Sequence, residues 1–182
     1  MSLASLALLA LALIPDASAA EQRLALDPAR SGVTALGSKV IGSHLLSFPA
    51  LAGEVVLSEG APRSLEVTVV MGELSTDIAS LTAHLLSPDF FDTASFPKAR
   101  FVSSRIAPGN AAAGATHTVT GALTIHGITR EVSFPATITV SPQGFRGQAE
   151  LTLDRQDYGV SFPGKSDNLI RDAVVLTVDL AG

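Results

Sequence analysis

The stretch VTGALTIHGITREVSF, residues 119–134, decides the fold, because apolar and polar residues alternate along it on both sides of one tight turn. Val119 and Leu123 alternate with threonines, and after Gly127 the alternation resumes toward Phe134. A period of two residues places successive side chains on opposite faces of a strand. The stretch therefore predicts two neighbouring antiparallel strands, each with one apolar face.

The same period of two recurs along much of the chain. Turn signals rich in glycine and proline, such as residues 59–62 (EGAP) and 141–144 (SPQG), separate the alternating segments. Short strands joined by tight turns predict an all-β antiparallel meander, which forms either a barrel or a sandwich. The alternating segments are residues 65–71, 99–106, 119–125, 128–134, 137–140, 145–153 and 174–180.

Residues 76–87, TDIASLTAHLLS, break this period. Ile78, Leu81 and Leu85 recur at spacings of three and four residues, which predicts one short helix inserted between strands. Any of residues 75–77 is available as the N-cap, and a proline lies just beyond the predicted end.

The segment after this helix, SPDFFDTASFPKARFVSS, residues 87–104, concentrates the aromatic side chains. It holds Phe90, Phe91, Phe96 and Phe101, half of the eight phenylalanines in the chain. The segment joins a helix to a strand. We therefore expect these rings to hold the helix against the sheet or across the mouth of a barrel.

Residues 1–20 have the pattern of a secretory signal peptide. An apolar run from Leu6 to Ile14 is too short to span a membrane, and small residues of the A-x-A type precede residue 21. The positively charged start that is usual for such peptides is missing. We expect a signal peptide at residues 1–20 and one domain over residues 21–182.

Charge and composition exclude several classes of function. The chain has 17 acidic and 12 basic residues among 182, a net charge of −5, and no basic cluster that would neutralise phosphates, which argues against nucleic-acid binding. It has no cysteine, so disulfides and thiol chemistry are excluded. Stability must come from packing.

Composition leaves the content of the interior open. The inward positions are mostly Val, Leu and Ile, with Gly121, Gly147 and Ala149 among them, and the chain has one tyrosine and no tryptophan. A barrel of about eight strands is just wide enough to be filled by its own side chains or to hold one small ligand. An elongated apolar cavity and a fully packed core are therefore both consistent with the sequence.

Candidate catalytic and metal-binding residues are few. The spacing of the four histidines fits no metal motif, and no G-x-S-x-G elbow is present. His84, in the predicted helix, either caps the polar end of a ligand or forms a hydrogen bond at the helix end. Arg155 is expected to pair with a carboxylate such as Asp167 or Asp172, and Lys39 is either a solvated strand-edge lysine or a contact for an anionic head group. The histidines are His44, His84, His117 and His126.

Several stretches together resemble the YceI family of exported bacterial proteins. They are GSKVIGSHLLSFPALAGEV (37–55), the His84-Leu85 pair with residues 87–104, VTGALTIHGITREVSFP (119–135), LDRQDYGV (153–160) and NLI (168–170). The resemblance implies a lipocalin-like antiparallel barrel of about eight strands with one short helix, whose apolar cavity binds a polyisoprenoid lipid. It also implies that the helix and the phenylalanine-rich segment lie beside that cavity.

The resemblance, combined with the phase of the alternation, predicts the residues that line the cavity. A register error of one residue would move the whole set of a strand to its other face. The predicted ligand-binding residues are Val67, Val69, His84, Phe90, Phe91, Phe101, Leu123, Ile125, Leu151 and Leu176.

The sequence departs from the family pattern at polar and aromatic positions. Leu81 and Thr82 stand where family members commonly have an Arg-Asp pair, and Arg30 replaces the histidine of a His-Ser pair. Ala35 stands where an aromatic residue usually lies beside the cavity. These changes leave the identity of the ligand and its head-group contacts open.

The leading hypothesis is a periplasmic, non-enzymatic protein that sequesters or carries an isoprenoid lipid of polyprenyl or quinone type. No other cofactor, no metal, no nucleic acid and no stable membrane insertion are expected, and the oligomeric state, including a homodimer, stays open. One alternative is an enzyme that acts on a hydrophobic substrate with His84 or His126 as base. Another is a structural or partner-binding barrel without a ligand.

Overall fold

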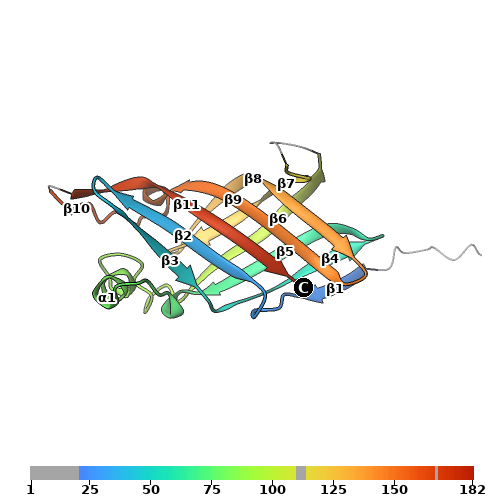
Figure 1. The fold of residues 1–182 in the computed structure, drawn as a ribbon, viewed down its shortest axis with the longest axis horizontal. Helices are drawn as coiled ribbons and strands as arrows, with labels where there is room; N and C mark the ends of the chain where they lie inside the picture. Colours follow the sequence, from blue (N-terminus) through green and yellow to red (C-terminus); the bar gives the residue numbers. More distant parts are fainter. Residues whose placement is uncertain (1–20, 110–113, 167) are drawn as a thin grey trace, which may run out of the picture.

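One long antiparallel sheet, curled into a barrel, dominates the computed structural model, which describes residues 21–109, 114–166 and 168–182 (Figure 1). The prediction for residues 1–20 lies outside the described residues. The strands are β1 (Glu21–Ala25), β2 (Gly32–Lys39), β3 (Ser43–Phe48), β4 (Leu51–Ser58), β5 (Ala61–Val70), β6 (Lys98–Pro108), β7 (His117–Ile125), β8 (Ile128–Ser141), β9 (Gly144–Asp154), β10 (Gly164–Lys165) and β11 (Asn168–Ala181).

The strands follow the order β1-β4-β5-β6-β7-β8-β9-β11-β2-β3, and β10 pairs with β11. Every ladder is antiparallel. The all-β antiparallel barrel with one short helix is thus confirmed. The strands number eleven in the described residues rather than about eight, because short strands such as β1, β3 and β10 add to the long ones.

The two edge strands, β1 and β3, are not joined to each other by a ladder, so the barrel has a seam. Hydrogen bonds from connecting segments bridge parts of it. Ser47 and Ser75 exchange two backbone hydrogen bonds of 2.9 and 3.0 Å. The N–H of Asp27 donates to the carbonyl of Ala181 at 2.7 Å, where the chain passes from β1 to β2.

Two hairpin turns share one backbone conformation. Glu59 and Gly60 join β4 to β5 with φ of 52° and 75°, and His126 and Gly127 join β7 to β8 with φ of 51° and 74°. Two successive positive φ values match the right-handed twist of a hairpin, and glycine adopts the second one without steric strain. The tight turn predicted between the two strands around Gly127 is thus a two-residue hairpin turn.

Strand β8 is longer than the sequence predicted. Two strands, 128–134 and 137–140, were expected on either side of Pro135, but β8 runs without a break through this proline. Residues 128–136 of β8 pair with β7, whereas the ladder between β8 and β9 begins only at Ala136. Proline has no N–H to donate to a ladder, and pairing with β9 stops beside it. Residues 128–135 of β8 and 150–154 of β9 therefore face each other across a split in the sheet.

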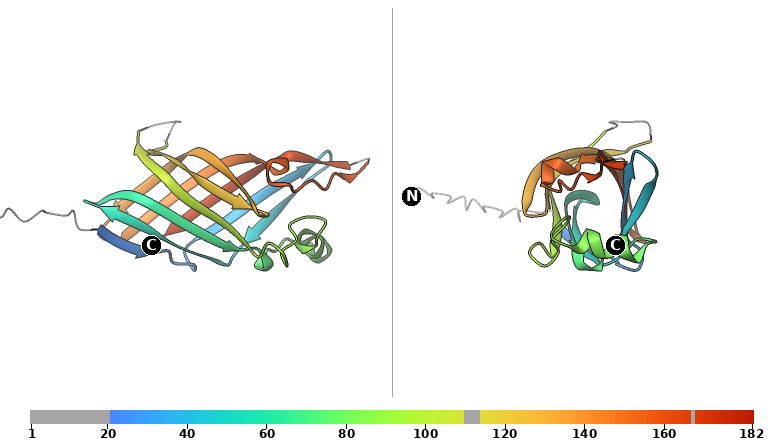
Figure 2. Two further views of the ribbon diagram at one scale, coloured as in Figure 1. Left: turned by 180° about the vertical axis from the view of Figure 1, so that it is seen from behind. Right: turned by 90° about the vertical axis from the view of Figure 1, so that its left-hand side faces the viewer.

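The predicted helix is present but shorter, α1 (Ala79–Leu86), and it lies beside one end of the barrel (Figure 2). We call this end the mouth. The expected cap at residues 75–77 is wrong, since the N-cap is Ile78 and no side chain caps it directly. The hydroxyl of Thr76 instead accepts a hydrogen bond from the Ile78 N–H at 3.2 Å, which fixes the entry to the helix. Two short 3-10 helices, η1 (Met71–Glu73) and η2 (Arg155–Tyr158), also lie at the mouth.

The opposite end of the barrel is filled by its own side chains. Leu26, Val55 and Leu57 are buried there and pack in the main hydrophobic core. None of the three lines the internal cavity described below. The barrel therefore has a packed floor at one end and a mouth beside α1 at the other.

Candidate functional site

An apolar cavity of about 240 Å³ lies inside the barrel between the packed floor and the mouth. Side chains from β2, β3, β5 to β9 and β11 form its wall, and α1 and the phenylalanine-rich segment contribute at the mouth. The alternation of the strands aims these side chains inward, as on β5, where buried and partly exposed residues alternate. Nine of the ten predicted ligand-binding residues lie in this wall: Val67, Val69, Phe90, Phe91, Phe101, Leu123, Ile125, Leu151 and Leu176.

Strand register stacks several of these residues side by side. Val67 on β5 pairs with Phe101 on β6, which in turn pairs with Leu123 on β7. Across the barrel, Leu151 on β9 pairs with Leu176 on β11. Cross-strand partners lie about 5 Å apart, so these positions form continuous apolar bands around the cavity. That they contact a ligand stays a prediction.

His84, the tenth predicted residue, does not belong to the cavity wall. Its ring packs edge-on against Phe90, with 5.4 Å between centroids, and against Phe162 at 4.7 Å. Its Nε2 lies 3.4 Å from Oδ2 of Asp89, and 36% of the side chain is exposed. His84 therefore stands behind Phe90, one ring away from the cavity, and a direct contact with a ligand stays a prediction.

The phenylalanines of residues 87–104 divide into two groups. Phe90 and Phe91 lie beside each other at the mouth, 6.1 Å between centroids, and both line the cavity. Phe96 instead packs on His126 at 4.4 Å, against the β7–β8 turn. Both groups therefore pack the segment against the barrel, as expected. Only Phe90, Phe91 and Phe101 face the interior.

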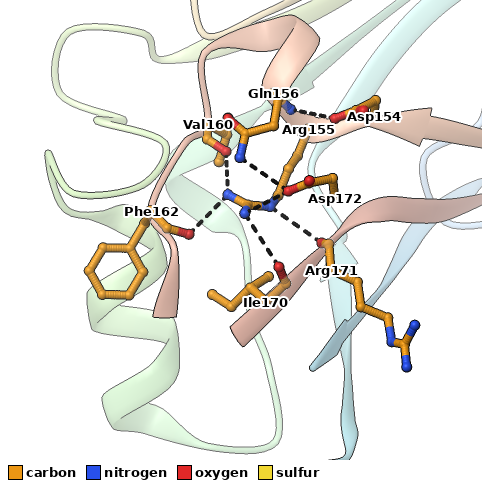
Figure 3. A network of polar contacts seen from close by, with 8 residues as sticks. All are labelled: Asp154, Arg155, Gln156, Val160, Phe162, Ile170, Arg171 and Asp172. Carbon is orange, nitrogen blue, oxygen red and sulfur yellow. Dashed lines mark hydrogen bonds and ion pairs between the residues drawn. The ribbon is translucent and has the colours of Figure 1, made fainter. Parts of the chain in front are cut away.

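Arg155 is the one buried charged residue among those the structure describes, with 8% of its surface exposed. It begins η2, where β9 ends, and its guanidinium points into the connection that leads to β11 (Figure 3). The predicted ion pair is confirmed for Asp172. Its five N–H groups are occupied by the carbonyls of Val160 (2.6 Å), Phe162 (2.9 Å), Arg171 (3.3 Å) and Ile170 (3.5 Å) and by the carboxylate of Asp172 (2.8 Å).

This set of partners decides the role of Arg155. A guanidinium has five N–H donors, and here none is left for a ligand. Carbonyls that would otherwise be unpaired in a buried connection are satisfied instead. Arg155 therefore holds the segment that follows η2, through Val160 and Phe162, against the start of β11, and it does not act as an anion receptor.

Tyr158 stands at the split between β8 and β9, where it lines both the cavity and an outer groove. It is buried, and its hydroxyl has no hydrogen-bond partner among the described residues. Burial raises the pKa of this hydroxyl above its ordinary value of 10.0, and the Asp157 carboxylate raises it further while Arg130 opposes the shift. Sequence reasoning missed this residue because the split between the strands has no local signature.

The surface of the cavity is almost entirely apolar. The wall includes one histidine and one serine, His44 and Ser38, and no hydrogen bond joins them. Nowhere in residues 21–109, 114–166 and 168–182 do three metal-ligating side chains gather. What this arrangement can do chemically is to exclude water from an apolar guest.

His126, proposed as an alternative base, has a structural position. It is the first residue of the β7–β8 turn, and its Nδ1 lies 3.3 Å from the carbonyl oxygen of Tyr158. This contact and the packing on Phe96 tie the turn to η2. The ring is absent from the cavity wall.

Comparison with known proteins gives a family match and distant relatives. The YceI-like domain model matches residues 24–181. A UPF0312 protein of Pseudomonas putida strain W619 is 28% identical over 132 residues, which covers 68% of this chain and 67% of that protein. A UPF0312 protein of Pseudomonas fluorescens strain SBW25 is 32% identical over 112 residues, 58% of this chain and 57% of that protein.

Solved structures share the fold. BcnA of Burkholderia cenocepacia superposes with a TM-score of 0.77 at 25% identity, covering 86% of this chain and 99% of that one. A polyisoprenoid binding domain from Saccharophagus degradans gives a TM-score of 0.68 at 18% identity, covering 86% and 95%. No described helix has the length and apolar character needed to cross a bilayer.

Proposed function

This chain belongs to the YceI-like domain family, and from that premise we propose that it binds one isoprenoid lipid, of polyprenyl or quinone type, in the barrel cavity. The S. degradans neighbour is described as a polyisoprenoid binding domain, which supports the choice of ligand class although the likeness to it concerns the fold. The role proposed is to carry or store the lipid.

One observation carries the proposal, namely an apolar cavity of about 240 Å³ inside the barrel. An apolar cavity of roughly 150 Å³ already stays free of water and takes up a hydrocarbon guest. A guest chain gains about 0.8 kcal/mol for each methylene removed from water, so several prenyl methyls and methylenes bind well without a polar contact. The rigid rings of Phe90, Phe91 and Phe101 line a path for such a chain at little entropic cost.

Binding without catalysis is the function that the wall supports. A hydrolase or transferase needs a nucleophile and a base within reach of each other and of the substrate. The described wall has no such pair, and the guanidinium of Arg155 is fully occupied by backbone carbonyls and Asp172. No specific observation favours the enzyme alternative.

The proposed place of action is the periplasm. Support comes from residues 1–20, whose apolar run and small residues before position 21 resemble a signal peptide. A carrier in an aqueous compartment would shield its lipid from water while the lipid moves between membranes.

The first experiment is native mass spectrometry of the protein recovered from its own periplasm, followed by organic extraction of whatever is released. We expect an isoprenoid at near-unit stoichiometry. Titration of emptied protein with farnesol and with a short-chain ubiquinone then measures affinity. A protein that is free of lipid and that also refuses both probes would contradict the proposal and favour the ligand-free barrel.

A matched pair of variants locates the site. Ala35 is buried in the cavity wall, and its neighbour Leu36 points outward from the same strand. Ala35→Phe fills the cavity and should weaken farnesol binding at least tenfold, because the ring takes the place of the guest. Leu36→Phe should leave the affinity for farnesol unchanged. Equal affinities in the two variants would place the binding site elsewhere.

A further inference from the structure

Five large apolar side chains are exposed together at the mouth. Val40 and Ile41 form the tip of the β2–β3 hairpin and are 60% and 76% exposed. The Val40 N–H donates to the carbonyl of Leu169 at 3.1 Å, so the tip lies against the start of β11. The apolar rim, as we call this group, consists of Val40, Ile41, Leu45, Ile78 and Leu169.

The α1 side of the rim is linked to the hairpin as well. Ile78 is the N-cap of α1, and the carboxylate of the preceding Asp77 lies 3.8 Å from Nδ1 of His44. His44 lies on β3 next to Leu45 and lines the cavity. The rim therefore follows the edge of the cavity from β11 to the helix.

Among the described residues, the large apolar side chains that are exposed all lie in the half of the barrel nearest the mouth. Two other large hydrophobic residues are exposed, Leu36 and Val70. Leu36 is the cross-strand partner of Leu45, and Val70 ends β5 next to η1 at the mouth. None lies at the packed floor. A group of this kind at one place on a protein surface marks a site of interaction.

Cations accompany the rim. Lys39 directly precedes Val40, and Nε of Arg171 donates to the Lys39 carbonyl at 3.4 Å. Lys165 lies on β10, the short strand that pairs with β11 beside Leu169. In the part of the chain that the structure describes, none of these three has a carboxylate within ion-pairing distance, whereas Arg23, Arg100 and Arg146 each have one. Within the described residues, these three side chains are available to an external anion.

We propose that the apolar rim docks the mouth of the barrel onto an anionic lipid surface. Val40 and Ile41 enter the headgroup region, and the cations on β2, β10 and β11 meet lipid phosphates. Apolar tips flanked by Lys and Arg bind interfaces through buried apolar area together with attraction to anionic lipids. The net charge of −5 opposes approach of the protein as a whole to an anionic surface, so docking depends on the apolar tip and on these cations.

This inference rests on the proposed function, and it describes how the lipid passes between the membrane and the cavity. Moving a prenyl lipid from a bilayer into water costs about 0.8 kcal/mol of transfer free energy for each methylene that becomes exposed. A cavity whose edge is seated in the membrane receives the chain without that exposure. The rim borders the cavity through Lys39 and His44, which lie in the cavity wall.

The test uses the chain without residues 1–20, because their apolar run would itself bind membranes, and all described elements lie within residues 21–182. Co-sedimentation is measured with vesicles of phosphatidylethanolamine and phosphatidylglycerol, and with phosphatidylcholine vesicles for comparison. Binding should be stronger to the anionic vesicles and should weaken with salt.

Rim variants are compared with a distant control. The double variant Val40→Ser with Ile41→Ser should lower partitioning at least tenfold, since the first change removes about two carbons from the inserted tip and the second about three. Lys165→Ala and Arg171→Ala should each lower it roughly fivefold. Arg63→Ala, an exposed cation at the start of β5 near the packed floor, should change nothing.

Two further measurements separate the docking proposal from the proposed function. Farnesol added in solution should bind the serine double variant as it binds the parent, while transfer of lipid from vesicles should be lost. Loss of vesicle binding in Arg63→Ala alone, or equal binding by all variants, would overturn the docking. So would a dimer that the serine changes convert to monomer, since the rim would then cover a second copy. If farnesol never binds but rim-dependent sedimentation holds, the docking stands and the lipid-carrier function fails.

Discussion

Nη2 of Arg155 lies 2.8 Å from Oδ1 of Asp172, yet 7% of the first side chain is exposed and 51% of the second. The two residues therefore share one ion pair but depend on it to different degrees. The carboxylate has water as an alternative partner. The buried guanidinium has no such alternative, and the four carbonyls that it satisfies are buried or partly buried.

Replacing the two partners should have unequal effects. Arg155→Met should lower the free energy of unfolding by about 3 kcal/mol or more, because buried carbonyls lose their donor. Asp172→Asn should lower it by about 1 kcal/mol or less, since half-exposed ion pairs contribute little. Urea unfolding followed by circular dichroism measures both. Similar losses in the two variants would show that the ion pair, and not the carbonyl set, stabilises the mouth.

The two equivalent hairpin turns offer a matched test of packing. Gly60→Ala places a Cβ in open space, so it should lower the free energy of unfolding by about 1 kcal/mol through the positive φ alone. Gly127→Ala has the same φ but brings its Cβ to 2.6 Å from the Phe96 ring. It should therefore lose about 1 kcal/mol more. In a Phe96→Ala background, the difference between the two glycine variants should disappear.

Tyr158 should titrate above its ordinary pKa, and its ionisation should weaken the fold. Because its pKa in the folded chain is raised above 10.0, the folded state holds the proton more tightly than the unfolded state. Its contribution to stability is complete below pH 10.0 and is lost as the pH rises through the raised pKa. The chain has one tyrosine and no tryptophan, so phenolate absorbance reports this residue alone. Folded protein that titrates like the chain in guanidinium would contradict the assignment.

Removing the Tyr158 hydroxyl should not destabilise the protein at neutral pH. The hydroxyl is buried without a partner among the described residues, so Tyr158→Phe removes an uncompensated polar group. We expect the free energy of unfolding to stay the same or to rise by up to about 1 kcal/mol. A loss greater than this, measured by urea unfolding, would show that the hydroxyl has a partner in solution.

The cavity wall was predictable because strand alternation has a fixed period. Once the phase of β5 or β7 is read from residues such as Val67 and Leu123, every second residue faces the same side. The position of His84 relative to the cavity could not be predicted in this way. The face of a short helix that meets the barrel depends on how the helix docks, and that docking is set here by rings far apart in sequence, such as Phe90 and Phe162.

Features that depend on distant strands were not predictable. Pro135 reads locally as a strand break, yet β7 supports the strand through it on one side while β9 departs on the other. The carbonyl partners of Arg155 come from residues 160–171, which the β10–β11 pairing brings back to η2, and only the Asp172 pair was predicted. The exposed tip at Val40 and Ile41 depends on where the β2–β3 turn meets the start of β11.

The split between β8 and β9 is a place where the barrel can widen. Along residues 128–135 and 150–154 each strand keeps its ladder with the neighbour on its other side, so widening the split breaks no ladder hydrogen bond. A single hydrogen bond from Arg130 Nε to the Asp157 carbonyl, 3.1 Å, links β8 to η2 at this level. Side chains such as Phe134, Leu151 and Tyr158 line both sides of the split, so widening the barrel there requires that these three residues repack and leaves the ladders intact.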